Sequence, residues 1–217
     1  MAIPDTPPVA PSARFRHPFP QWVRYAAIAW LIVWAVTYEI YWGASSFLYL
    51  CDMAVVFTCI GLWIPNWTAS RLLISSQAVC SVLIDSFWAI DVVVRLIAHR
   101  HIIGGTEYLF DPHYPVWVRS MSLFHVALPP LLLWATRRNG YDSRGFRLQA
   151  LIAALAMIVS RFAGPDKNIN FAFTGPIVNQ QWGPAPVHLA CMFFGLVLVI
   201  YWPTHLLMLW WDRRARQ

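Results

Sequence analysis

Six long apolar stretches alternate with short polar, Gly-bearing or Pro-bearing segments along the chain. They cover residues 22–43, 46–64, 72–98, 116–136, 147–163 and 186–211. A helix needs about 20 predominantly apolar residues to cross the hydrocarbon core of a bilayer. The pattern therefore predicts an all-α polytopic membrane protein, a bundle of six transmembrane helices.

The segments outside these stretches give the domain organisation. Residues 1–20 are rich in proline and have no apolar core, which predicts a disordered cytoplasmic tail. Residues 21–212 form a single six-helix transmembrane domain. Residues 213–217 carry three arginines and form a short basic tail.

Composition narrows the function class. Of the 217 residues, 59% are hydrophobic and 12% are charged, whereas a soluble domain carries about 25% charged residues. This excludes a soluble globular enzyme, a disordered protein and a nucleic-acid binder.

The net charge of +6 is a signal of topology. With the N-terminus inside, eleven of the sixteen Lys and Arg residues lie on the cytoplasmic side. The positive-inside rule then places both termini in the cytoplasm, in agreement with an even number of spans. We expect an inner, or plasma, membrane protein.

Ionisable side chains gather in the half of the bundle that faces away from the cytoplasm. An ionisable group in the bilayer core costs about 2.5–3.5 kcal/mol, so it normally faces protein or water and marks a functional site. We expect a shared polar cavity open to the outer face; the alternative is pairwise contacts, such as an i,i+4 ion pair between Asp91 and Arg95. The residues of the cavity are Asp52, Asp85, His125, Arg161, His188 and two cysteines, Cys51 and Cys191.

Two kinds of chemistry fit these residues. Asp52, Asp85, His125 and His188 are suitable ligands for a divalent metal. Alternatively, a Cys51 thiolate activated by His125 takes an acyl group as a thioester, which a second nucleophile discharges. A loop from His99 to His113 holds three histidines and two carboxylates, but their spacing matches no metal-ligand signature.

Five short motifs, in this order, resemble the family of transmembrane protein 164 and its bacterial YwaF-type relatives over about residues 46–203. The first is Ser46-Phe47-Leu48-Tyr49-Leu50-Cys51-Asp52, similar to the Leu-x-Leu-Cys opening of a helix in that family. The others are Gln77-Ala78 before Asp85, Phe124-His125, Asn168-Ile169-Asn170-Phe171-Ala172-Phe173, and Gly183-Pro184-Ala185-Pro186.

The resemblance implies a membrane-embedded acyltransferase that uses no cofactor. Cys51 would accept the acyl group, His125 would be the base, and Asp52 or Asp85 would orient His125. Asn168 and Asn170 would stabilise an oxyanion or bind a lipid headgroup; capping and turn formation is their structural alternative. Arg161 and His188 complete the expected substrate-binding set.

We therefore expect lipid acyl transfer or hydrolysis in the outer half of the bilayer, with membrane lipids as partners. A metal-dependent lipid hydrolase is one alternative. Another is a non-enzymatic subunit of a larger membrane complex, or a carrier, that binds a small molecule, a pigment or a partner helix. Transport is disfavoured because the sequence has no internal repeat and no pair of broken helices.

Overall fold

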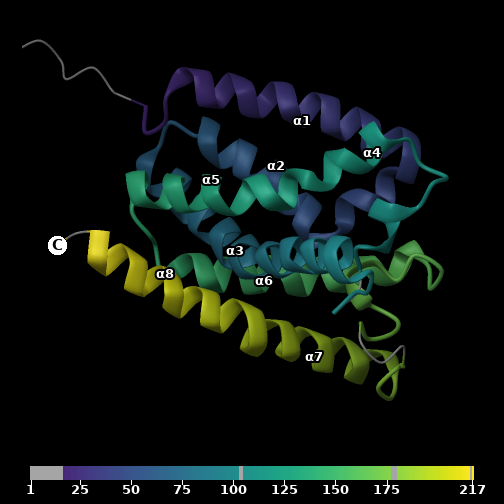
Figure 1. The fold of residues 1–217 in the computed structure, drawn as a ribbon. Helices are drawn as coiled ribbons and strands as arrows, with labels where there is room; N and C mark the ends of the chain where they lie inside the picture. Colours follow the sequence, from purple (N-terminus) through teal and green to yellow (C-terminus); the bar gives the residue numbers. More distant parts are fainter. Residues whose placement is uncertain (1–16, 103–104, 177–179, 216) are drawn as a thin grey trace, which may run out of the picture.

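The computed structural model describes residues 17–102, 105–176, 180–215 and 217, and this part of the chain is helical without strands (Figure 1). The α-helices are α1 (Gln21–Trp42), α2 (Leu50–Trp63), α3 (Trp67–Ala98), α4 (Val116–Ser120), α5 (Phe124–Asn139), α6 (Arg144–Ser160), α7 (Ala185–Leu196) and α8 (Trp202–Ala215). Short 3-10 helices are η1 (Ala44–Leu48), η2 (Glu107–Phe110), η3 (Met121–Leu123), η4 (Arg161–Ala163) and η5 (Ile169–Phe171), and a π-helical turn, η6 (Val197–Tyr201), joins α7 to α8. The all-α prediction is confirmed.

Among the described residues, four helical segments are long and apolar enough to cross a membrane, which indicates a membrane protein. They are Gln21–Trp42, Val116–Asn139, Arg144–Ala163 and Ala185–Arg214. The other two predicted stretches are also helical, but α2 has only 14 residues because Ala44–Leu48 forms a 3-10 turn instead of extending it.

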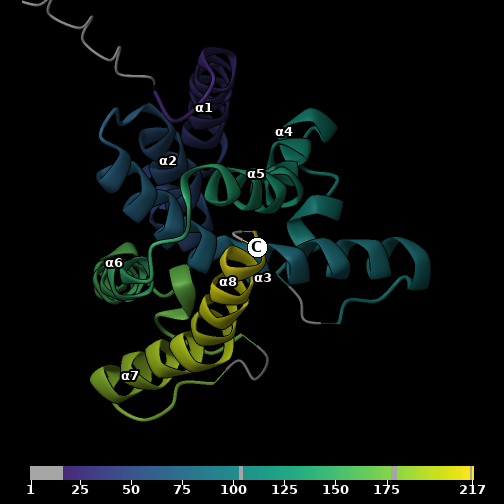
Figure 2. The same ribbon diagram turned by 90° about the vertical axis from the view of Figure 1, so that its left-hand side faces the viewer.

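α3 is the central helix of the bundle and contacts α2, α5, α6 and α8. Small side chains on its first half allow this close packing: an added Cβ on Gly145 of α6 would lie 2.8 Å from the Ser75 carbonyl carbon. The later part of α3 projects away from the other helices (Figure 2). Its exposed side chains are apolar there, including Ile90, Val93, Leu96 and Ile97.

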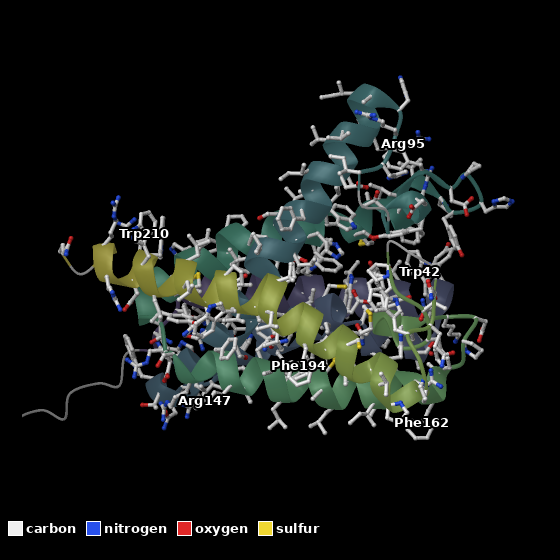
Figure 3. The ribbon with its side chains drawn as sticks, turned by 90° about the horizontal axis from the view of Figure 1, so that it is seen from below. Trp42, Arg95, Arg147, Phe162, Phe194 and Trp210 are labelled. Carbon is white, nitrogen blue, oxygen red and sulfur yellow. The ribbon has the colours of Figure 1, made fainter. Side chains whose placement is uncertain are left out.

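The chain enters and leaves the bundle at one end, where α1 begins and α8 finishes (Figure 1). Arg147 and Trp210 lie toward that end, whereas Trp42, Arg95 and Phe162 lie toward the other (Figure 3). We call these the terminal end and the loop end of the bundle. The first turn of α2, which follows α1 and η1, lies at the loop end.

The predicted boundaries of the two tails need correction. Phe19 is only 2% exposed and packs on Trp134, and the Pro18 carbonyl accepts a 2.6 Å hydrogen bond from Arg138 Nε. Residues 17–20 are thus anchored on the bundle, while the rest of the predicted tail, 1–16, lies outside the described residues. Near the C-terminus of the chain, Arg213 and Arg214 belong to the last turn of α8.

Candidate functional site

Cys51 and Asp52 form the first turn of α2, where Asp52 is 3% exposed and Cys51 is half-buried. The Cys51 thiol lies 3.8 Å from Asp52 Oδ1, within the reach of an S–H···O hydrogen bond. A carboxylate in the first turn of a helix is favoured by the helix dipole. The thiol therefore has a carboxyl oxygen directly beside it as a hydrogen-bond acceptor.

Asp85 of α3 approaches this pair from the centre of the bundle. It is 1% exposed and interacts electrostatically with Cys51 and Asp52. Its Oδ2 has no hydrogen-bond partner among the described residues. Since a buried polar atom without a partner costs about 1–3 kcal/mol, this oxygen is suited to accept a hydrogen bond from a substrate or a water molecule.

Two tyrosines surround the carboxyl groups. Tyr38 of α1 shares a 2.9 Å hydrogen bond with Ser122 Oγ and interacts electrostatically with Asp52. Tyr108 of η2 lies beside the same serine and near Cys51 and Asp52. Desolvation raises the pKa of Tyr108, so its phenol keeps its proton and can donate.

His125 lies on α5 beside this cluster, with its ring stacked 4.0 Å from Phe124 and 4.5 Å from Trp88. Its Nδ1 is 2.8 Å from the Ser122 carbonyl oxygen. A carbonyl only accepts hydrogen bonds, so Nδ1 carries the proton and Nε2 holds the lone pair. His125 is thus oriented by Ser122, not by Asp52 or Asp85 as expected, although its Nε2 is free to act as a base.

Asn170 links the loop after α6 to the start of α2. Its Oδ1 accepts from the Leu50 backbone N–H at 3.0 Å, and its Nδ2 donates to the Leu48 carbonyl at 2.7 Å and to Ser160 Oγ at 3.0 Å. Its φ of 52° is left-handed, a conformation that Asn tolerates. Asn170 therefore positions the turn that carries Cys51.

Asn168 has a similar role within the loop itself. Its Oδ1 accepts from the backbone N–H groups of Phe173 and Thr174, at 2.9 and 3.1 Å. Its Nδ2 donates to the Thr174 side chain at 2.8 Å. The side-chain amides of both asparagines thus form hydrogen bonds within the protein, which agrees with the alternative that they stabilise turns.

Arg161 and His188 hold the same loop. Arg161 donates to the Ala172 carbonyl at 2.9 Å and stacks 3.9 Å over the Phe173 ring. His188 is fully buried, accepts from the Trp182 N–H at 3.1 Å and donates from Nε2 to the Phe171 carbonyl at 2.9 Å. With both ring nitrogens bonded, His188 has no free donor atom for a metal.

In the described part of the chain, no three His, Cys, Asp or Glu side chains are grouped as metal ligands. In the His-rich loop, Asp91 Oδ2 lies 2.8 Å from His101 Nδ1 and accepts a 2.5 Å hydrogen bond from the Thr106 hydroxyl. His113 Nδ1 lies 2.6 Å from Asp111 Oδ1. Arg95, the expected partner of Asp91, donates to the His99 carbonyl. The contacts of His101 and Thr106 with Asp91 fix the loop against the C-terminal end of α3.

Replacing Asn170 with alanine is expected to destabilise the protein by about 1–3 kcal/mol, because two backbone groups and Ser160 lose their partner. Thermal unfolding in detergent measures this. Gln181→Ala, which removes an exposed amide bonded to Gly183, is the control and should change stability by less than about 0.5 kcal/mol. An Asn170→Ala protein of unchanged stability would contradict the structural role.

The structure thus places Cys51, Asp52 and Asp85 within electrostatic range of one another, and it links His125 to Tyr38 through Ser122. Asn168 and Asn170 lie in the loop after α6, and Arg161 of η4 and His188 of α7 bond to backbone carbonyls of that loop. Comparisons of this chain with protein-family models, curated proteins and solved structures found no match.

Proposed function

We propose that this protein is a membrane-embedded enzyme that transfers or hydrolyses lipid acyl chains through a thioester on Cys51. The observation that carries this proposal is the half-buried Cys51 thiol beside the buried Asp52 carboxyl, with Asp85 in electrostatic range. The resemblance of the motifs around Cys51, His125 and Asn170 to the transmembrane protein 164 family favours the same chemistry.

The proposed topology has six spans, with α2 and α3 as the two crossings beyond the four long apolar segments. Both chain ends lie at the terminal end of the bundle (Figure 1), as an even number of spans requires. Arginines concentrate there, which favours a cytoplasmic location for that end and an outward-facing site in the inner membrane. They are Arg71, Arg137, Arg138, Arg144, Arg147, Arg213 and Arg214.

In the first half-reaction, the Cys51 sulfur attacks the carbonyl carbon of a lipid ester while Asp52 accepts the thiol proton. The bond from this carbon to the alkoxy oxygen breaks, a thioester forms, and the proton passes to the departing lysolipid alcohol. Tyr108 is suited to donate a hydrogen bond to the developing oxyanion.

In the second half-reaction, a hydroxyl group of a lysolipid or of water attacks the thioester. His125 Nε2 takes the proton of this hydroxyl, and Asp85 Oδ2 is the acceptor that orients it. The new ester or the free acid leaves, and the Cys51 sulfur recovers a proton from His125. The acceptor decides between transfer and hydrolysis.

The direct test uses the purified protein in phosphatidylcholine vesicles with a labelled acyl chain and a lysophospholipid acceptor. We expect label to move to the acceptor, or to free fatty acid when the acceptor is omitted. Because the thioester route needs no metal, EDTA should leave the rate unchanged. Absence of both products would contradict the proposal, and a rate abolished by EDTA and restored by a divalent metal would favour the metal-dependent hydrolase.

A further inference from the structure

A pocket of about 400 Å³ lies between the start of α6 and the last helix, α8. It is lined by Ser143, Arg144, Phe146, Arg147, Trp202 and His205. Arg147 lies toward the terminal end of the bundle (Figure 3), whereas Cys51 lies at the loop end. The pocket is therefore separate from the proposed acyl-transfer site.

Three aromatic rings form one part of the pocket wall, and one of them carries a nitrogen that is available to a ligand. The His205 ring packs 5.1 Å from the Phe146 ring and 5.7 Å from the Trp202 ring. Its Nδ1 shares a 2.7 Å hydrogen bond with the Tyr141 hydroxyl, so Nε2 is the ring nitrogen left for a ligand. The wall can thus contact both apolar and polar parts of a bound molecule.

Two arginines supply positive charge, and they differ in their partners. Arg144 is fixed by Asp142, with contacts of 3.0 Å from Nε and 2.7 Å from the terminal nitrogen. Arg147 is exposed and has no hydrogen bond or ion pair to any described residue. Its guanidinium is therefore free to pair with an external anion.

We infer that this pocket binds the phosphate of an anionic lipid headgroup, with Arg147 as the main contact. Guanidinium groups pair with phosphate through two parallel hydrogen bonds, and basic pockets between membrane helices on the cytoplasmic side bind anionic headgroups. A volume of about 400 Å³ lies within the range of small-molecule sites. Trp202 and Trp210 on α8 are typical of the membrane interface, where such headgroups lie.

The test titrates the purified full-length protein in neutral detergent with phosphatidylglycerol and follows binding by native mass spectrometry. Arg147→Gln is expected to weaken binding about tenfold, the cost of one charge-assisted hydrogen bond. Arg213→Gln removes the same charge from an exposed position on α8 outside the pocket and is expected to weaken binding less than about twofold. Thermal unfolding confirms that both variants are folded.

If the two substitutions weaken phosphatidylglycerol binding equally, the lipid is attracted to the positive charge of arginines in general, and the inference is overturned. Inorganic phosphate distinguishes the sources of the anion: at millimolar concentration it should fail to displace the lipid if the headgroup is the ligand. Displacement that depends on Arg147 would identify the free ion as the ligand of the same pocket. The readout is binding, so it is independent of acyl transfer at Cys51.

Discussion

Cys51→Ser is expected to lower the rate of lipid acyl transfer by at least about a thousandfold, because every later step of the proposed reaction requires the thioester that Cys51 forms. Serine has nearly the size of cysteine, so the first turn of α2 and its contacts with Asn170 should persist. A serine hydroxyl is a far weaker nucleophile beside Asp52 than a thiol is. Initial rates in vesicles of defined lipid composition measure the effect.

Cys191→Ser is the matched control for this substitution. Cys191 is exposed on α7, away from the first turn of α2, and its replacement should leave the transfer rate within about twofold. If the Cys51→Ser protein is folded and keeps its rate, Cys51 is not the nucleophile. If both variants lose activity equally, the effect belongs to thiols in general and not to this site.

Gly145→Ala is expected to destabilise the protein by about 2–3 kcal/mol, because the added methyl group overpacks a helix–helix contact. A Cβ at this position would lie 2.8 Å from the Ser75 carbonyl carbon and 2.8 Å from the Ser76 nitrogen. These are backbone atoms of α3, so relief requires the whole helix to move away from α6. The midpoint of thermal unfolding in detergent measures the change.

Gly195→Ala tests whether this effect is specific to the contact. Gly195 lies in α7, and nothing lies within 4 Å of the Cβ that alanine would add. Alanine favours a helix by up to about 1 kcal/mol relative to glycine, so this variant should be as stable as the parent or more stable. Equal unfolding midpoints for Gly145→Ala and the parent would contradict the close contact of α3 and α6.

The helices could be predicted from the sequence because bilayer thickness sets the length of an apolar stretch. Their ends could not, since they depend on local hydrogen bonds. Hydropathy continues from Ser46 into α2, but the Ser46 hydroxyl donates to the Gly43 carbonyl at 2.8 Å and the segment forms a 3-10 turn. Likewise, a proline-rich composition does not reveal that the Phe19 ring packs against the Trp134 ring.

One part of the candidate site, the proximity of two acidic residues from different helices, agrees with the expectation from the sequence. Asp52 belongs to α2 and Asp85 to α3, and the structure places them in electrostatic range of each other. Tyr108 was not predicted, because it reaches the cluster from the loop after α3, which has no periodic pattern. Ser122 lies in η3 within the predicted stretch 116–136, where a serine does not by itself indicate a site. A buried histidine also does not reveal its partner: His125 pairs with the Ser122 carbonyl three residues before it.

Asn168, Asn170, Arg161 and His188 show why polar residues near a predicted cavity are ambiguous from sequence alone. The loop after α6 and the turn between η1 and α2 have backbone groups that no helix satisfies, and these side chains satisfy them. Asn170 bonds the Leu50 N–H and the Leu48 carbonyl, and His188 bonds the Phe171 carbonyl. The sequence shows which residues are polar, but it does not show that their side chains already form hydrogen bonds with the backbone of the fold.

Peptide mass spectrometry of the protein after incubation with a labelled phospholipid tests the thiol chemistry most directly. The acyl group should be found on the peptide that contains Cys51, should be released by hydroxylamine, and should disappear in the Cys51→Ser protein. Acyl label on Cys59, Cys80 or Cys191, or label on no cysteine while transfer proceeds, would contradict it.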